Sequence, residues 1–236
     1  TKENWKDFMP YDENIFIEGM DLFKDHMVIS ERRGGITQLR IRPWSGKDEH
    51  YIKFDEESYT VGSGINPDFD TNLLRLDYTS LAAPNTTYDY NVESRELTLL
   101  KQQEVVGKFD PKDYVSERRM VKAADGTMVP LSIVYKKGFT KDGSHPFLLY
   151  GYGSYGYSMD PYFSSTRLSL LDRGFGFAIA HIRGGQEMGR NWYENGKFFT
   201  KKNTFTDFID CGDYLVKEGY AAKDKLFANG GSAGGL

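Results

Sequence analysis

Cysteine, long apolar runs and clustered positive charge are nearly absent from this chain, and each absence excludes a class of protein. Cys211 is the one cysteine among 236 residues, so no intrachain disulfide forms and a reducing compartment is indicated. No stretch approaches the ~20 consecutive apolar residues of a membrane-spanning helix. The N-terminal TKENWKDFMP lacks the basic-then-apolar layout of a signal peptide. We therefore expect a cytoplasmic protein that does not bind membranes.

Basic residues are outnumbered by acidic ones. Lys and Arg total 30 against 34 Asp and Glu, which gives a net charge of −4. Nucleic acids attract proteins with clustered Lys and Arg, so no nucleic-acid partner is expected. No metal or cofactor is expected either. His26, His50 and His145 lack the spacing of metal ligands, and the glycines at 62 and 64 lack the GK[ST] of a phosphate-binding loop.

Aromatic residues are plentiful at 15%, and in residues 1–106 they accompany short strands separated by turns. Residues 27–31 and 36–41 flank Gly34 and Gly35, which predicts a hairpin. The stretches LLRLDYTS, TTYDYN and ELTLLKQ are further candidate strands. This spacing is typical of a sandwich, a barrel or a propeller, and no clear internal repeat decides among the three.

From about residue 107 the pattern changes to alternating strands and helices. A hairpin turns at Asp125-Gly126. An apolar strand in PFLLYGYG then precedes a helix in FSSTRLSLLDRG, a buried strand in FGFAIAHIRGG and a helix in NTFTDFIDCGDYLVKEG. Thr204 with Asp207 indicates a capping box for the second helix, and Gly219 its end. KLFAN forms a last strand, and this order predicts a parallel α/β sheet.

The stretch NGGSAGGL after that strand contains G-x-S-x-G at residues 230–234. In α/β hydrolases this pattern is a tight strand-to-helix turn that exposes a nucleophilic serine, and small neighbours are needed because the backbone packs closely there. Ser232 is therefore the candidate nucleophile, and the backbone N–H of Ala233 is the candidate donor to the oxyanion. The alternative is a structural glycine loop.

A second oxyanion donor is expected near the end of an earlier strand, where the sequence reads LYGYGSYGYS. Glycines let the main chain approach a ligand, and a tyrosine hydroxyl can replace a backbone donor. Aromatic packing beside a domain interface explains the same residues, so the chemistry alone leaves both interpretations open. We interpret His181, Glu187 and Cys211 as structural residues.

Several of these stretches occur together in one known family. YGYGSYG, TRLSLLDRG, HIRGGQEMGRNWYENGKFFTKKNTFTDFIDC and NGGSAGGL, with AAPNTTYDYN and DPKDYVSERRMVKAADGTMVPLSIVYKK before them, resemble the prolyl oligopeptidase family of serine peptidases. The alanine in GGSAGG favours its oligopeptidase B type. The resemblance implies that residues 1–106 are the last blades of a seven-bladed β-propeller. Residues 107–236 would begin an α/β-hydrolase domain, with Ser232 as nucleophile and the Tyr152 hydroxyl and Ala233 N–H as oxyanion hole.

The resemblance also implies a substrate class. The propeller would exclude folded proteins, and the oligopeptidase B type cleaves short peptides after Arg or Lys by an acyl-enzyme mechanism. A family pattern like SIDADF supplies acids to the adjacent subsite, and this chain reads SMDPYF. Asp160 matches the first acid and Tyr162 replaces the second, which puts the strength of that preference in doubt. Asp160 as a plain turn residue before Pro161 is the alternative.

The four residues after Ser232 include no acid and no histidine, although the family's triad Asp and His follow the serine. We expect these 236 residues to be a piece of a longer enzyme, inactive unless the remainder of the catalytic domain is supplied. Two alternatives stay open. One is a prolyl- or acylaminoacyl-type peptidase of the same family, and the other is a non-catalytic binding module that contains propeller blades.

Overall fold

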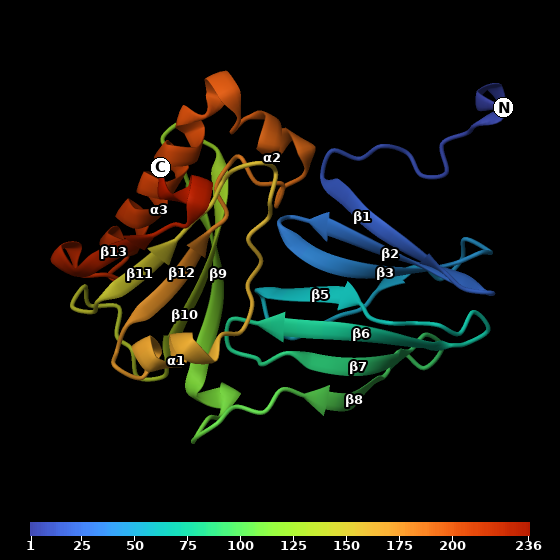
Figure 1. Cartoon of the computed structure of the whole chain (residues 1–236), viewed down its shortest axis with the longest axis horizontal. Helices are drawn as coiled ribbons and strands as arrows, with labels where there is room; N and C mark the ends of the chain where they lie inside the picture. The colour runs from blue at the N-terminus through green and yellow to red at the C-terminus, as the bar shows by residue number, and fades with distance from the viewer.

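The first part of the chain forms two four-stranded antiparallel sheets in which each strand pairs with its neighbours in sequence. The computed structural model describes residues 1–236 (Figure 1). The strands of the first sheet are β1 (Ile15–Leu22), β2 (His26–Arg33), β3 (Ile36–Pro43) and β4 (His50–Tyr51). Those of the second are β5 (Tyr59–Ser63), β6 (Leu73–Ser80), β7 (Thr86–Asn91) and β8 (Leu97–Gln102). The hairpin predicted around Gly34 and Gly35 is confirmed by the pairing of β2 with β3.

Alternation of apolar and polar residues explains how these two sheets pack. In β6 the side chains of Leu74 and Leu76 are fully buried, while those of the alternate residues Leu73, Arg75 and Asp77 are exposed. They meet Val28, Leu39 and Ile41 of the first sheet in a cluster of 11 buried residues. Consecutive four-stranded meanders packed face to face are the arrangement of propeller blades.

The second part is one five-stranded sheet with strand order β13-β11-β12-β10-β9. Its strands are β9 (Tyr114–Lys122), β10 (Met128–Lys136), β11 (Phe147–Tyr150), β12 (Gly176–Ala180) and β13 (Leu226–Asn229). The last three run parallel to one another, as predicted. The Asp125-Gly126 hairpin is confirmed too, and it makes β9 and β10 antiparallel, so the whole sheet is mixed.

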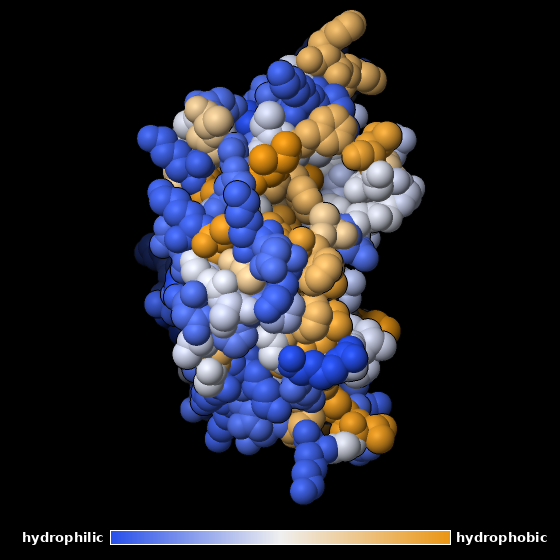
Figure 2. Space-filling view, turned by 90° about the vertical axis from the view of Figure 1, so that its left-hand side faces the viewer, coloured by the Kyte–Doolittle hydropathy of each residue, from blue (hydrophilic) through white to orange (hydrophobic).

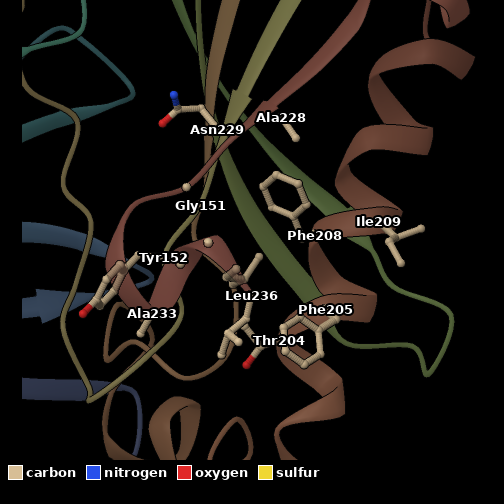
Figure 3. Close-up of a pocket in the computed structure, with 14 residues that line it drawn as sticks. Gly151, Tyr152, Thr204, Phe205, Phe208, Ile209, Ala228, Asn229, Ala233 and Leu236 are labelled. Carbon is tan, nitrogen blue, oxygen red and sulfur yellow. The ribbon is translucent and has the colours of Figure 1, made fainter.

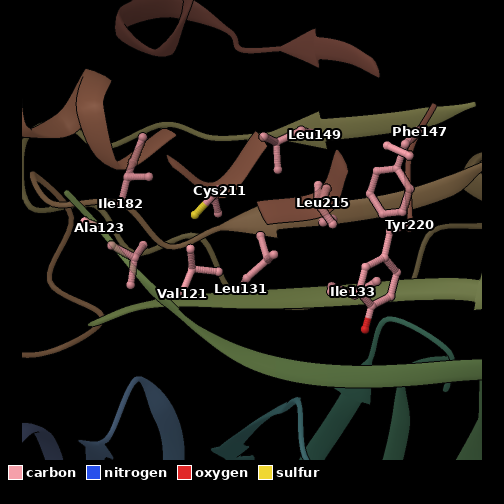
Figure 4. Close-up of a cluster of buried hydrophobic side chains, with 14 of the residues drawn as sticks. Val121, Ala123, Leu131, Ile133, Phe147, Leu149, Ile182, Cys211, Leu215 and Tyr220 are labelled. Atoms are coloured by element: carbon pink, nitrogen blue, oxygen red, sulfur yellow. The ribbon is translucent and has the colours of Figure 1, made fainter. Parts of the chain in front are cut away.

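Two helices cover opposite faces of this sheet. The helices of the chain are α1 (Ser165–Leu171), α2 (Arg190–Glu194) and α3 (Lys202–Lys217). On one face, Cys211 and Leu215 of α3 pack against Leu131 and Ile133 of β10 within a 16-residue cluster (Figure 4). On the other face, Leu171 of α1 joins a smaller cluster. Burial raises the pKa of the Cys211 thiol, which fits a packed residue. No helix has the length and apolar character needed to cross a bilayer.

The capping box predicted at Thr204 and Asp207 is wrong. Helix α3 begins at Lys202, so both residues lie inside its first turns. Thr204 Oγ1 donates to the Arg183 carbonyl at 2.7 Å, and the Asp207 carboxylate accepts from the Arg183 guanidinium at 2.6 and 2.9 Å. The predicted end is right, because Gly219 adopts φ 76° just after the helix.

The second blade packs directly against the five-stranded sheet (Figure 1). Leu81 and Ala82 share a buried cluster with Val134, Phe177 and Ile179. Polar contacts cross the same interface, since the Ser58 hydroxyl donates to Ser132 Oγ at 2.7 Å with both residues buried. The two parts of the chain therefore form a continuous packed interface.

Candidate functional site

Strand β13 ends in a strained turn that presents Ser232 to solvent. Ser232 has φ 54°, a left-handed conformation that is unfavourable for any residue with a Cβ. A Cβ on Gly230 would overlap the Gly234 carbonyl oxygen, so the two ends of the turn touch through glycine backbone. The Gly234 N–H donates to the Gly231 carbonyl at 2.9 Å and closes the turn. The sharp bend expected from G-x-S-x-G is present, while the nucleophilic role of Ser232 stays a prediction.

Tyr152 lies beside this turn because β11 and β13 are parallel neighbours whose carboxyl ends meet. A Cβ on Gly234 would lie 2.9 Å from the Gly151 carbonyl oxygen and 3.1 Å from the Tyr152 Cα, so the serine turn packs on the backbone of the tyrosine loop. Figure 3 shows Tyr152 and Ala233 next to each other. The Tyr152 ring packs edge-to-face on Tyr157 at 5.9 Å between centroids. The structure thus brings the three residues predicted for acyl chemistry to one sheet edge.

An open pocket of about 550 Å³ lies behind the turn, between β13 and α3 (Figure 3). Apolar side chains line much of it, among them Phe205, Phe208, Ile209 and Leu236. Ala233 and Gly234 contribute to its wall, but Ser232 does not. Tyr152 lines the same pocket, so the pocket adjoins both proposed oxyanion donors.

The loop that carries Tyr152 is held by residues that the sequence analysis did not single out. Lys201 Nζ donates to the Gly153 carbonyl at 2.5 Å and to Ser154 Oγ at 2.7 Å. Gly153 has φ 64°, and a Cβ on Gly184 would overlap the Gly153 carbonyl oxygen. Nothing in FFTKKNTF distinguishes Lys201 from Lys202 beside it, so no sequence signal was available.

Asp160 already has a cation partner within the chain. Its carboxylate accepts from the Arg32 guanidinium at 2.5 and 2.8 Å, and Arg32 also pairs with Glu18 at 2.6 Å. The Arg32 side chain is 6% exposed and that of Asp160 is 26% exposed. Neighbouring residues dock on the second blade as well, because the Pro161 carbonyl accepts from Thr60 Oγ1 at 2.9 Å. The predicted contact of Asp160 with a substrate cation stays a prediction, and the structure shows this carboxylate paired with Arg32.

Each of the four histidines contacts residues other than Ser232. His181 Nε2 is 2.7 Å from Ser132 Oγ, and His50 Nε2 is 2.9 Å from the Tyr90 hydroxyl. The rings of His26 and His145 stack on phenylalanines. Burial lowers the pKa of His181 to about 4, so its imidazole is neutral at pH 7. The interpretation of His181 as a buried structural residue agrees with this position, although its Nδ1 has no partner.

Two models of known protein families match this chain, one in its first part and one in its second part. Residues 1–103 match the model of the N-terminal β-propeller domain of prolyl oligopeptidase, and residues 161–236 match that of the prolyl oligopeptidase family. The chain belongs to the prolyl oligopeptidase family. The sheets of β1–β8 are therefore propeller blades, and β9–β13 belong to the start of the hydrolase domain. The expected boundary between residues 106 and 107 and the total of seven blades stay predictions.

Individual members of the family are similar along the whole chain. Dipeptidyl aminopeptidase BI of Pseudoxanthomonas mexicana is 51% identical over 237 residues, which cover 100% of this chain and 32% of that protein. Protease 2 of Moraxella lacunata is 40% identical, with 96% of this chain and 32% of the relative covered. The structure of oligopeptidase B from Trypanosoma brucei superposes with a TM-score of 0.86 at 40% identity, covering 96% of this chain and 33% of its own. The chain spans about a third of the length of these relatives.

Proposed function

We propose that these residues form part of a serine peptidase that hydrolyses short peptides through an acyl-enzyme. The observation that carries the proposal is the left-handed Ser232 at the carboxyl end of β13, packed against the loop of Tyr152. Family membership supports the same chemistry. A non-catalytic binding module would have no need for a serine held in a strained and exposed conformation.

In the proposed reaction, Ser232 Oγ attacks the scissile carbonyl carbon and the carbonyl oxygen becomes an oxyanion. The Ala233 N–H and the Tyr152 hydroxyl donate to this oxygen, and these donors are worth most where they are fixed before the reaction. The serine proton must pass to a base. The histidines of the chain are engaged elsewhere, so we propose that the base and its carboxylate come from the remainder of the catalytic domain.

The C-terminal sheet offers a surface for that remainder. Strand β13 is an edge of its sheet, with backbone groups free on one side. The face of the molecule on this side exposes apolar side chains (Figure 2). The large apolar residues of β13, α3 and the terminal turn that are exposed are Phe205, Ile209, Phe227 and Leu236. Covering such a patch with further strands and a helix would shield it from water.

For the substrate we propose peptides cleaved after Arg or Lys, which the resemblance to the oligopeptidase B type supports. A second candidate is removal of dipeptides from a free amino end, favoured by the 51% identity to a relative named dipeptidyl aminopeptidase BI. We also propose a cytoplasmic location, which the buried thiol of Cys211 supports.

The experiment uses the full-length protein with a fluorophosphonate probe and reporter peptides. Probe adduct mapped to Ser232, and its loss in Ser232→Ala, are the expected results. Peptide reporters with Arg, Pro or acetyl-alanine before the scissile bond test the specificity. Reporters with blocked and with free amino ends separate an endopeptidase from an enzyme that releases dipeptides from the amino end. Activity that survives in Ser232→Ala would overturn the proposed function.

A further inference from the structure

Lys201 is a partly buried cation without an anion. It directly precedes α3, and its ammonium reaches 48 residues back along the chain to the loop after β11. Its hydrogen-bond acceptors are the Gly153 carbonyl at 2.5 Å and Ser154 Oγ at 2.7 Å. No carboxylate lies within 4.0 Å, and the Phe205 ring lies 5.8 Å away from the charge. Burial lowers the pKa of the Lys201 ammonium.

This arrangement costs free energy that a surface lysine would avoid. Moving an ammonium out of water is unfavourable unless hydrogen bonds or an opposite charge replace the lost hydration. A lysine that served only to join α3 to the sheet would be expected to pair with an acid or to point into solvent. Lys202, the next residue, is exposed and shows that solvent is accessible at this point of the chain. The Lys201 charge is instead directed at the carbonyl of Gly153, the residue that follows Tyr152.

The Gly153 carbonyl is held from several sides. Gly153 has a left-handed φ of 64°, and its carbonyl lies against Gly184 so closely that a Cβ there would overlap the oxygen. Lys201 donates to the same oxygen, and Thr204 Oγ1 lies 3.5 Å from it. This carbonyl belongs to the peptide bond between Gly153 and Ser154, one residue after Tyr152, so holding it restrains the loop from which the tyrosine side chain projects.

We propose that Lys201 is a positioning residue for the oxyanion hole: it clamps the Gly153 carbonyl and the Ser154 hydroxyl, and so aligns the Tyr152 hydroxyl with the Ser232 turn. This inference rests on the proposed function, since it assigns Lys201 a task in the same reaction. A donor placed before the reaction begins avoids reorganisation in the transition state. Lys201 touches neither substrate nor the reacting atoms, so it acts through Tyr152.

Loss of the clamp should lower the rate of the chemical step more than it weakens substrate binding. Misplacing a catalytic group by about 1 Å costs roughly 10²-fold in rate. For Lys201→Met in the full-length protein we expect kcat to fall by about 10- to 100-fold and KM to change by less than about threefold. Lys201→Arg restores a donor and should recover most of the lost rate. Lys202→Met is the matched control and should behave as the unchanged protein.

A double-variant cycle with Tyr152→Phe separates positioning from a general structural effect. If Lys201 acts through the tyrosine hydroxyl, Lys201→Met combined with Tyr152→Phe will be no slower than Tyr152→Phe alone, because effects within one unit are not additive. Ser154→Ala, which removes one acceptor of Lys201, should lower kcat in the same direction by a smaller factor. This milder variant keeps the test informative if Lys201→Met folds poorly.

Three results would overturn the inference: full additivity in the cycle, equal losses in the Lys201 and Lys202 variants, or a change confined to KM. Ser232→Ala is measured in parallel. If activity disappears in Ser232→Ala but Lys201→Met and Ser154→Ala are unimpaired, the positioning role fails and the proposed function stands. If activity survives in Ser232→Ala, the proposed function itself fails.

Discussion

At the scale of single residues, the hydroxyl of Tyr152 is the most direct test of the site. Removing one oxyanion donor costs roughly 10²- to 10³-fold in kcat, so we expect that loss for Tyr152→Phe in the full-length protein, with KM little changed. The ring and its packing on Tyr157 are kept by this substitution. Tyr155→Phe is the control, because Tyr155 is 79% exposed in the same loop. Equal kinetics for the two variants would remove Tyr152 from the oxyanion hole.

Residues at the site differ in how readily the sequence reveals them. Ser232 and its glycines are adjacent in sequence, so one short stretch is enough to predict a turn with close backbone contact. Lys201 and Arg32 act on partners 48 and 128 residues away, and neither partner can be inferred from local pattern. In the sequence, Lys201 and Arg32 look like ordinary surface residues. Only the folded structure shows which acceptors they contact.

At the scale of elements, the turn after β13 depends on glycine at one end more than in its middle. A Cβ on Gly230 would overlap the Gly234 carbonyl, whereas one on Gly231 would meet nothing within 4 Å. Gly230→Ala should therefore open the turn and slow fluorophosphonate labelling of the full-length protein by roughly 10²-fold. Gly231→Ala should label at nearly the normal rate. Equal labelling of both variants would show that the turn is not held by this contact.

Helix α3 is anchored by a buried ion pair where the sequence indicated a cap. A Thr followed three residues later by an Asp is found both in capping boxes and at inward-facing positions inside a helix. Only the tertiary contacts of Thr204 and Asp207 distinguish these two interpretations. The side chains of Arg183 and Asp207 are 7% and 0% exposed. The strands other than β1, β4 and β5, both main helices and Gly219 followed from local pattern, whereas the use of Asp207 depended on Arg183 of another element.

Breaking that pair should loosen the helix. Removing one partner of a buried ion pair costs about 3–5 kcal/mol, and Asp125, which also pairs with Arg183 at 2.7 Å, keeps the Asp207→Ala cost near the lower value. Hydrogen exchange of α3 amides in the full-length protein should then speed up by roughly 10²-fold. Asp213→Ala, at an exposed position of the same helix, should leave exchange close to normal; comparable acceleration there would contradict the ion-pair account.

At the scale of the whole molecule, the interface between blades and hydrolase sheet determines what Asp160 can do. The Arg32 guanidinium belongs to a blade and pairs with a carboxylate of the hydrolase domain as well as with Glu18. The resemblance predicted blades and hydrolase sheet correctly, but no local pattern tells which charges meet between them. A substrate cation would have to compete with Arg32 for Asp160.

We therefore expect Asp160→Asn to change the preference for a basic residue at the adjacent subsite by less than about threefold, since a carboxylate already paired with Arg32 attracts a further cation less strongly. The ratio of kcat/KM for peptides with Arg and with Ala at that position, in the full-length protein, measures this. A loss of selectivity above tenfold would instead establish Asp160 as a substrate contact. The Glu18→Gln variant, which alters the other partner of Arg32, controls for changes in the interface itself.

The same interface contains two buried titratable groups with opposite effects on stability. Burial raises the pKa of Glu187 from 4.5 to about 7, so the folded protein keeps a proton that the unfolded chain releases. Its stabilisation is complete below pH 4.5 and is lost as the pH rises through about 7. Burial lowers the pKa of His181 from 6.5 to about 4. Its stabilisation is present above pH 6.5 and is lost as the pH falls through about 4.

Because the two contributions oppose each other between pH 4.5 and 6.5, the unchanged protein should show a shallow pH dependence of stability there. Glu187→Gln removes the carboxyl and leaves the histidine, so the variant should gain stability relative to the unchanged protein as the pH rises from 4.5 to about 7, by up to about 3 kcal/mol. Hydrogen exchange of β12 amides, corrected for the intrinsic effect of pH, measures this locally. Glu218→Gln, at an exposed position, should show no such trend. A difference between Glu187→Gln and the unchanged protein that stays constant across this range would mean that Glu187 is ionised in the folded state.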